Sequence, residues 1–233
     1  VMSISVILIL LLSKFFCFSK QITGSLLLVS ILTNSSFMGI PIVNAYMGES
    51  AIPYVLVYDQ LGTFIALAIY GTFIASYYSS KNQITFKIIT LKVLTFPPFI
   101  SLVAALFLMG VEFNPILSKV LASFSSTIVP MALVAVGLQL QFKLPKEDLK
   151  PFSIALVIKL IIAPIFAIII CKIFSWDNEV SVVSIMESAM APMITAGAIA
   201  SMAGLAPRLS SAIVGYGILI SFITTAILFK LIN

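Results

Sequence analysis

The sequence has few charged residues, two cysteines and no histidine. Asp, Glu, Lys and Arg make up 9% of its 233 residues, whereas a soluble domain carries about 25%. So few charges cannot cover a water-facing surface, which excludes an ordinary soluble globular protein, and the same composition excludes a disordered chain. The absence of histidine, with only Cys17 and Cys171 as cysteines, excludes a zinc-finger pattern and His-based catalysis.

Short motifs of common enzymes are also missing. The sequence contains no Walker A, GxSxG, HExxH or GxGxxG pattern, so we expect neither an ATP-driven pump nor an enzyme, and no cofactor or metal. The net charge is +5, but the basic residues are scattered between apolar runs. They indicate orientation in a lipid bilayer rather than nucleic-acid binding.

Long apolar segments fill most of the chain. Apolar residues make up 61% of the sequence, the mean hydropathy is +1.21, and a membrane span needs about 20 mostly apolar residues. We therefore predict an all-α membrane protein with eight spans: Val1–Phe18, Ile22–Tyr46, Ala51–Tyr78, Lys87–Met109, Leu117–Leu140, Leu149–Phe174, Val180–Met202 and Leu209–Ile232.

The distribution of lysine and arginine predicts the orientation of these spans. Nine lie in loops on one side: Lys14, Lys20, Lys81, Lys87, Lys92, Lys143, Lys146, Lys150 and Arg208. Only Lys119, Lys172 and Lys230 lie on the other side. The positive-inside rule predicts that the side with nine is cytoplasmic, so that both ends of this chain are non-cytoplasmic.

Two spans are interrupted in a similar way. Asn34, Gly39 and Pro41 lie midway along the second span, and Glu187, Met190 and Pro192 lie midway along the seventh. Turns containing Gly48 and Gly204 follow them. One proline in a membrane helix often only kinks it. Interruptions at matching places in two halves instead favour the binding site of a secondary transporter.

Charged residues also occur within the spans. Asp59, Lys159 and Glu187 lie at membrane depth, where each charge costs about 2.5–3.5 kcal/mol and is a functional candidate. For Lys159, an ion pair with either acid and a contact to an anionic substrate stay open. Asn34 and Gln60 offer hydrogen bonds to a polar solute or a carboxylate, and for Gln60 a bond between helices is an equal alternative.

These motifs, in this order, resemble those of the auxin efflux carrier family in its short prokaryotic form. The second span has Asn34, Gly39, Pro41 and the turn Gly48-Glu49, and the next has Tyr58-Asp59. Later spans have Pro130, Leu133 and Gly137, then Lys159, Leu160 and Pro164, then Glu187, Ala189, Met190 and Pro192, with Ala191 where the family usually has a first proline.

The resemblance implies a ten-helix transporter built from two inverted repeats, whose fourth and ninth spans are unwound and cross at the substrate site. Our eight spans then correspond to spans three to ten, and the first two are missing. Residues 1–78 would be the C-terminal part of the first repeat, residues 79–86 a cytoplasmic linker, and residues 87–233 the second repeat. Members of this family are similar to carriers of malate, malonate, other organic anions and, in plants, auxin.

We therefore expect a permease for small organic anions in the inner membrane of a prokaryote. The expected substrate-binding residues are Asn34, Gly39, Pro41, Gln60, Met190 and Pro192. Asp59, Lys159 and Glu187 are candidates for coupling or gating. Protons are the expected coupling ion, because a carboxylate among apolar helices binds a proton readily, and Na⁺ stays open because freed backbone carbonyls also coordinate cations. A homodimer is an open alternative, and so is a truncated or structural membrane protein without transport activity.

Overall fold

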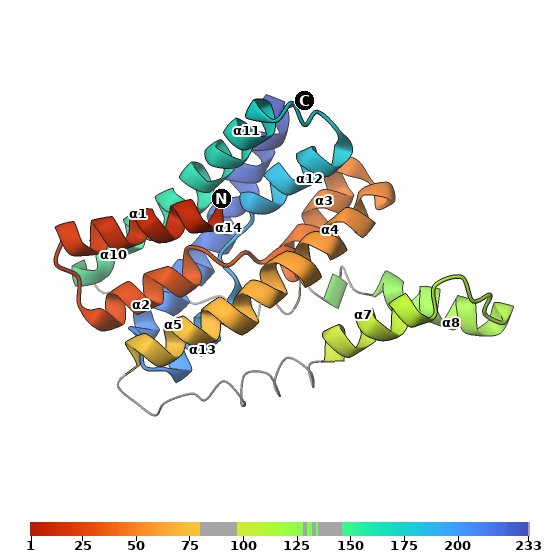
Figure 1. Ribbon diagram of the computed structural model, residues 1–233, viewed down its shortest axis with the longest axis horizontal. Coiled ribbons are helices and arrows are strands. Elements are labelled where there is room, and N and C mark those ends of the chain that lie inside the picture. Colours follow the sequence, from red (N-terminus) through yellow and green to blue (C-terminus); the bar gives the residue numbers. More distant parts are fainter. Residues whose placement is uncertain (80–96, 128–129, 132–133, 135–145, 233) are drawn as a thin grey trace.

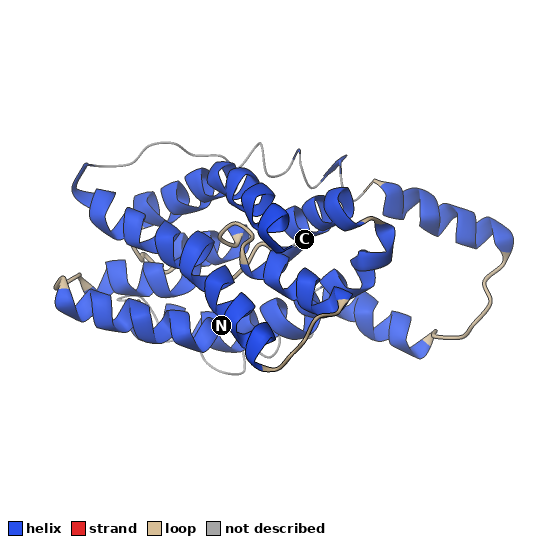
Figure 2. Cartoon of the chain, turned by 90° about the horizontal axis from the view of Figure 1, so that it is seen from above, coloured by secondary structure: helices blue, strands red, loops and turns tan. Residues whose placement is uncertain are grey.

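The computed structural model describes residues 1–79, 97–127, 130–131, 134 and 146–232. In these ranges every regular element is a helix (Figures 1 and 2), which confirms the all-α class. Residues 80–96, 128–129, 132–133 and 135–145, which include Leu133, Gly137 and most of the predicted linker, lie outside the described residues. So do the first part of the predicted span Lys87–Met109 and most of the last part of Leu117–Leu140.

The helices follow the predicted apolar segments, with several of them divided into shorter pieces. The α-helices are α1 (Met2–Phe15), α2 (Lys20–Val29), α3 (Ile40–Met47), α4 (Ile52–Val57), α5 (Thr72–Tyr78), α7 (Pro97–Phe107), α8 (Pro115–Ser126), α10 (Leu149–Val157), α11 (Ala163–Ile173), α12 (Glu179–Ser188), α13 (Ile194–Met202) and α14 (Pro207–Ile232). The π-helices are η1 (Ser35–Gly39), η3 (Tyr58–Phe64), η4 (Leu67–Gly71) and η6 (Ile158–Ile162), and the 3₁₀-helices are η2 (Glu49–Ala51) and η5 (Lys146–Asp148).

Three continuous helices in the described part are long and apolar enough to cross a membrane. They are Glu49–Tyr78, Lys146–Ile173 and Pro207–Ile232, of 30, 28 and 26 residues. The helix Met2–Phe15 is apolar but shorter. An integral membrane protein is therefore confirmed, while the full number of eight spans and their inverted repeat stay predictions.

Both spans with the Asn, Gly and Pro patterns are interrupted. Helix α2 ends at Val29 and helical structure resumes at Ser35, whereas α12 ends at Ser188 and α13 begins at Ile194. The glycines beyond these spans adopt positive φ, 81° at Gly48 and 71° at Gly204, a conformation that glycine adopts without steric cost. Each interrupted span therefore ends in a sharp turn.

Small residues allow the central helices to approach closely. A Cβ at Gly197 of α13 would lie 2.8 Å from the Val214 side chain of α14, and one at Gly24 of α2 would lie 2.6 Å from Tyr78. Such small residues are typical of helix contacts within membranes. By contrast, α8 has no buried residue, and α7 and α8 extend to one side of the other helices (Figure 1).

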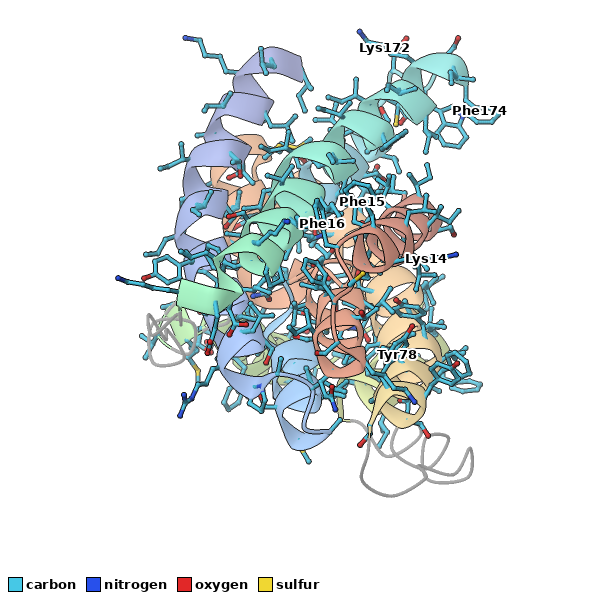
Figure 3. The ribbon with its side chains drawn as sticks, turned by 90° about the vertical axis from the view of Figure 1, so that its left-hand side faces the viewer. Lys14, Phe15, Phe16, Tyr78, Lys172 and Phe174 are labelled. Carbon is cyan, nitrogen blue, oxygen red and sulfur yellow. The ribbon has the colours of Figure 1, made fainter. Side chains whose placement is uncertain are left out.

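Loops that the lysine distribution assigns to the same side of the membrane contact each other. Ser50 donates to Glu179 at 3.3 Å, which joins two loops predicted to be non-cytoplasmic. Ser79 donates to the Ala203 carbonyl at 2.9 Å, which joins two regions predicted to be cytoplasmic. Lys172 and Tyr78 lie at opposite ends of the helices (Figure 3). These two contacts agree with the predicted grouping of the four loops that they join, and which group faces the cytoplasm stays a prediction.

Candidate functional site

The two interruptions pair with each other through their backbones. Thr33 and Pro192 form an isolated antiparallel bridge. On either side of it the Asn34 N–H donates to the Ala191 carbonyl at 2.9 Å, and the Met193 N–H donates to the Leu32 carbonyl at 3.0 Å. Backbone groups freed by a broken helix need partners in lipid. This pairing supplies them, and it brings together residues that are far apart in the sequence.

A buried carboxylate lies beside this crossing. Asp59 is 4% exposed, and its Oδ1 accepts hydrogen bonds from the hydroxyls of Ser35 at 2.5 Å and Ser36 at 2.6 Å. Its Oδ2 accepts a bond from the Gln60 side-chain amide at 2.6 Å. Three donors therefore offset much of the cost of burying Asp59, because a buried charge is tolerated when it is hydrogen-bonded.

The two polar atoms of the Asn34 side chain have different surroundings. Its side-chain oxygen accepts a bond from the Phe37 N–H at 3.3 Å and caps η1. Its amide nitrogen is buried and has no hydrogen-bond partner among the described residues. A buried donor without a partner costs about 1–3 kcal/mol, so this nitrogen is a candidate ligand-binding group.

A cavity of about 140 Å³, which we call the Asp59 cavity, joins these groups to the start of α13. Asn34, Ser36, Asp59 and Gln60 line one side. The other side includes residues 193–195, at the beginning of α13. In the part of the chain that the structure describes, no side chain caps this helix. Its first backbone N–H groups and its dipole therefore favour an anion there.

Lys159 and Glu187 form a second buried cluster on the other side of Thr33. Lys159 is 2% exposed and donates to the Thr33 hydroxyl at 2.6 Å and to the Ser188 carbonyl at 3.3 Å. Glu187 is 0% exposed, and neither of its oxygens has a hydrogen-bond partner within the described ranges. It lies within electrostatic range of both Lys159 and Asp59.

The helical segments that carry Asp59 and Lys159 are wound more widely than an α-helix. Asp59 and Gln60 lie in η3, Lys159 lies in η6, and η1 follows Asn34 directly. Short π-helical segments within α-helices often mark functional sites. Their wide turns change which side chains face the crossing, so simple helical periodicity does not predict these contacts.

The structure brings together only some of the predicted substrate-binding residues. Asn34 and Gln60 line the Asp59 cavity, together with the predicted coupling residue Asp59. Gly39 lies against the Glu187 carboxylate, and the Pro192 ring lies against Gly217 of α14. Pro41 and Met190 are buried in the packing around the crossing. For all six predicted substrate-binding residues, a direct contact to substrate stays a prediction.

Sequence reasoning missed Ser35, Ser36 and Thr33 as site residues. The first two hold Asp59, and the third holds Lys159. A signal was present, because the run Thr33-Asn34-Ser35-Ser36 places four polar residues in succession inside an apolar span. Their partners could not be predicted, because they lie on other helices.

Replacement of Gly39 by Ala is expected to lower the free energy of unfolding by about 1–3 kcal/mol, the usual cost of overpacking. The added Cβ would collide with the buried Glu187 carboxylate. Thermal unfolding in detergent measures the effect. Gly62→Ala in η3 is the matched control, because nothing lies within 4 Å of its added Cβ. Equal melting temperatures for the two variants would contradict the predicted contact.

A comparison with models of protein families identifies the family of this chain. The family model described as membrane transport protein matches residues 1–229. The chain belongs to this family. The match confirms the resemblance to the auxin efflux carriers, and its description fits the expectation of a transporter rather than an enzyme.

Two archaeal relatives are similar to this chain. An uncharacterized transporter of Methanocaldococcus jannaschii is 28% identical over 172 residues, which cover 72% of this chain and 54% of the relative. An uncharacterized transporter of Methanothermobacter thermautotrophicus is 23% identical over 184 residues, which cover 76% of this chain and 58% of the relative. The chain thus spans little more than half the length of these relatives.

Proposed function

We propose that this protein is a proton-coupled secondary transporter of small organic anions, such as malate or malonate, in the inner membrane of a prokaryote. The observation that carries the proposal is the unpartnered amide of Asn34, which lines the same cavity as the start of α13. Both groups are hydrogen-bond donors; in the described part of the chain the Asn34 amide has no acceptor, and no side chain caps α13. A carboxylate would supply that acceptor.

Proton coupling is supported by the position of Asp59. An ionised Asp59 would repel an anion bound in the same cavity, whereas a protonated Asp59 would not. Binding of a proton at Asp59 would therefore favour binding of the anion, and the reverse must hold by linkage. The charge balance agrees with this, since the described residues include two buried acids, Asp59 and Glu187, and one buried cation, Lys159.

Reconstitution into proteoliposomes tests this function. We expect saturable uptake of radiolabelled malate or malonate that increases when the side from which the substrate enters is more acidic. A sodium gradient at constant pH tests the alternative coupling ion. Flux no greater than in protein-free vesicles would instead favour a truncated or structural membrane protein. The intact mass of the native protein, measured in parallel, shows whether further spans belong to it.

Asp59→Asn is expected to remove the dependence of uptake on the proton gradient. The substituted amide keeps the shape of the side chain and still accepts a hydrogen bond from Ser35 or Ser36, but it cannot take up a proton. Exchange of internal for external substrate should continue. Ser25→Ala is a matched control, because Ser25 is a buried polar residue of α2 away from the cavity. Unchanged proton dependence in Asp59→Asn would exclude Asp59 as the coupling residue.

A further inference from the structure

A second and larger cavity lies on the other side of η3. Its volume is about 660 Å³, and it is bounded by the start of α1, by η3, by α11 and by α12. We call it the Ser184 cavity. Tyr58 and Gly62 of η3 line it, whereas their neighbours Asp59 and Gln60 line the Asp59 cavity. The segment η3 therefore separates the two cavities.

The inner end of the Ser184 cavity reaches the hydrogen-bond partners of Lys159. Ser188 lines the cavity, and its carbonyl accepts a bond from the Lys159 ammonium group at 3.3 Å. Tyr58 also lines it, and its hydroxyl lies next to the Thr33 side chain, which accepts the other bond from Lys159. One layer of polar groups thus separates the cavity from a buried cation.

The wall formed by α12 is suited to water. Ser181, Ser184 and Ser188 line the cavity, and each hydroxyl donates to a backbone carbonyl three or four residues earlier. Their oxygen lone pairs remain able to accept hydrogen bonds from water. The cavity is open on one side and most of its lining is apolar, but its α12 wall offers water the several polar partners that an ordered water needs.

The outer end of the cavity lies at the loop between α11 and α12. Trp176 and Asn178 of this loop line it. The lysine distribution assigns the loop to the non-cytoplasmic side, and Lys172 and Phe174 at the end of α11 mark the corresponding end of the molecule (Figure 3).

We propose that the Ser184 cavity is a water-filled access path from the non-cytoplasmic side to the hydrogen-bond partners of Lys159. The role of this path in transport rests on the proton-coupled cycle proposed above. In that cycle the path connects bulk water with the Lys159–Glu187 cluster. Glu187 enters this cluster from α12, and the Asp59 carboxylate of η3 lies within electrostatic range of Glu187. The other helices that contact η6 have their basic side chains near the helix ends: Lys14, Lys150, Lys172, Arg208 and Lys230.

Cysteine labelling tests the access path in the full chain. In a Cys17→Ser/Cys171→Ala background, Ser184→Cys is exposed to a membrane-impermeant maleimide in right-side-out vesicles. Val182→Cys is the matched control, because Val182 is half-buried on the same helix, as Ser184 is, but does not line the cavity. We expect Ser184→Cys to react at least about tenfold faster than Val182→Cys, since thiol labelling follows access to water.

Two further variants test the inner end and the width of the path. Ser188→Cys should react with a small methanethiosulfonate reagent from the non-cytoplasmic side. In a Cys17→Ser chain, the native Cys171 thiol, which also lines the cavity, should be labelled, and Ser184→Leu should slow that labelling. Failure of Ser184→Cys to react, equal rates at positions 182 and 184, or reaction only in inside-out vesicles would overturn the proposal. Labelling needs no transported substrate, so a failure of uptake would bear on the proposed function alone.

Discussion

Replacement of Asn34 by Ala is expected to abolish saturable organic-anion uptake while the protein still inserts into the membrane. The change removes the buried amide donor in the Asp59 cavity and the cap of η1. A hydrogen bond to a charged group contributes about 1.5–3 kcal/mol, which corresponds to about a ten- to hundredfold loss of affinity. Initial uptake rates over a range of substrate concentrations measure the loss, and protein in the membrane fraction is quantified alongside.

Asn34→Asp separates binding from capping. The carboxylate can still accept the bond from the Phe37 N–H, but it replaces the donor in the cavity with a negative charge. We expect uptake to be lost as completely as in Asn34→Ala, although the cap of η1 is kept. Ser30→Ala is the control, because Ser30 is buried in the same interruption with an unpartnered hydroxyl but does not line the cavity. Wild-type uptake by Asn34→Asp would exclude the Asn34 amide as a substrate ligand.

Lys159→Met is expected to have the largest effect on stability, a loss of about 3–5 kcal/mol, as found when one partner of a buried charge pair is removed. The substitution keeps the length and the apolar contacts of the side chain. It leaves the Thr33 hydroxyl and the Ser188 carbonyl without their donor, and it removes the cation that lies within electrostatic range of Glu187. Thermal unfolding in detergent, followed by the loss of monodisperse protein, measures this effect.

Glu187→Gln shows whether the cost arises from uncompensated charge. Alone, it should destabilise the protein less than Lys159→Met does, because the described residues include a second buried acid, Asp59, and because the Glu187 carboxylate has no hydrogen-bond partner there to lose. Combined with Lys159→Met, it should recover part of the lost stability, since residues in one electrostatic cluster are not additive. Additive losses in the double variant would mean that Lys159 acts only through its contacts to Thr33 and Ser188.

The helical segments and the two interruptions could be predicted because they depend on local sequence. Long apolar runs predict helices in a membrane, and Pro41 and Pro192 within such runs predict that the helix is disturbed nearby. Asp59, Lys159 and Glu187 could be singled out individually, because a charge at membrane depth is costly wherever it lies.

The contacts of the site could not be predicted in the same way, because they join distant parts of the chain. Nothing local to Ser35 or Ser36 indicates that each hydroxyl binds Asp59, which lies on another helix. The π-helical turns at η3 and η6 add to the difficulty, because they change the face on which Gln60 and Lys159 point. A regular helical periodicity would group these residues differently.

The backbone pairing at Thr33 and Pro192 restricts how the site can move. Separating the two interruptions would unpair the Asn34 N–H from the Ala191 carbonyl and the Met193 N–H from the Leu32 carbonyl. Each buried backbone group left without a partner costs about 1–3 kcal/mol. We therefore expect the four half-helices that meet here to move together as one rigid body. If the site opens alternately to the two faces of the membrane, this rigid body would move against the helices around it. The backbone pairing at the crossing would be kept during that movement.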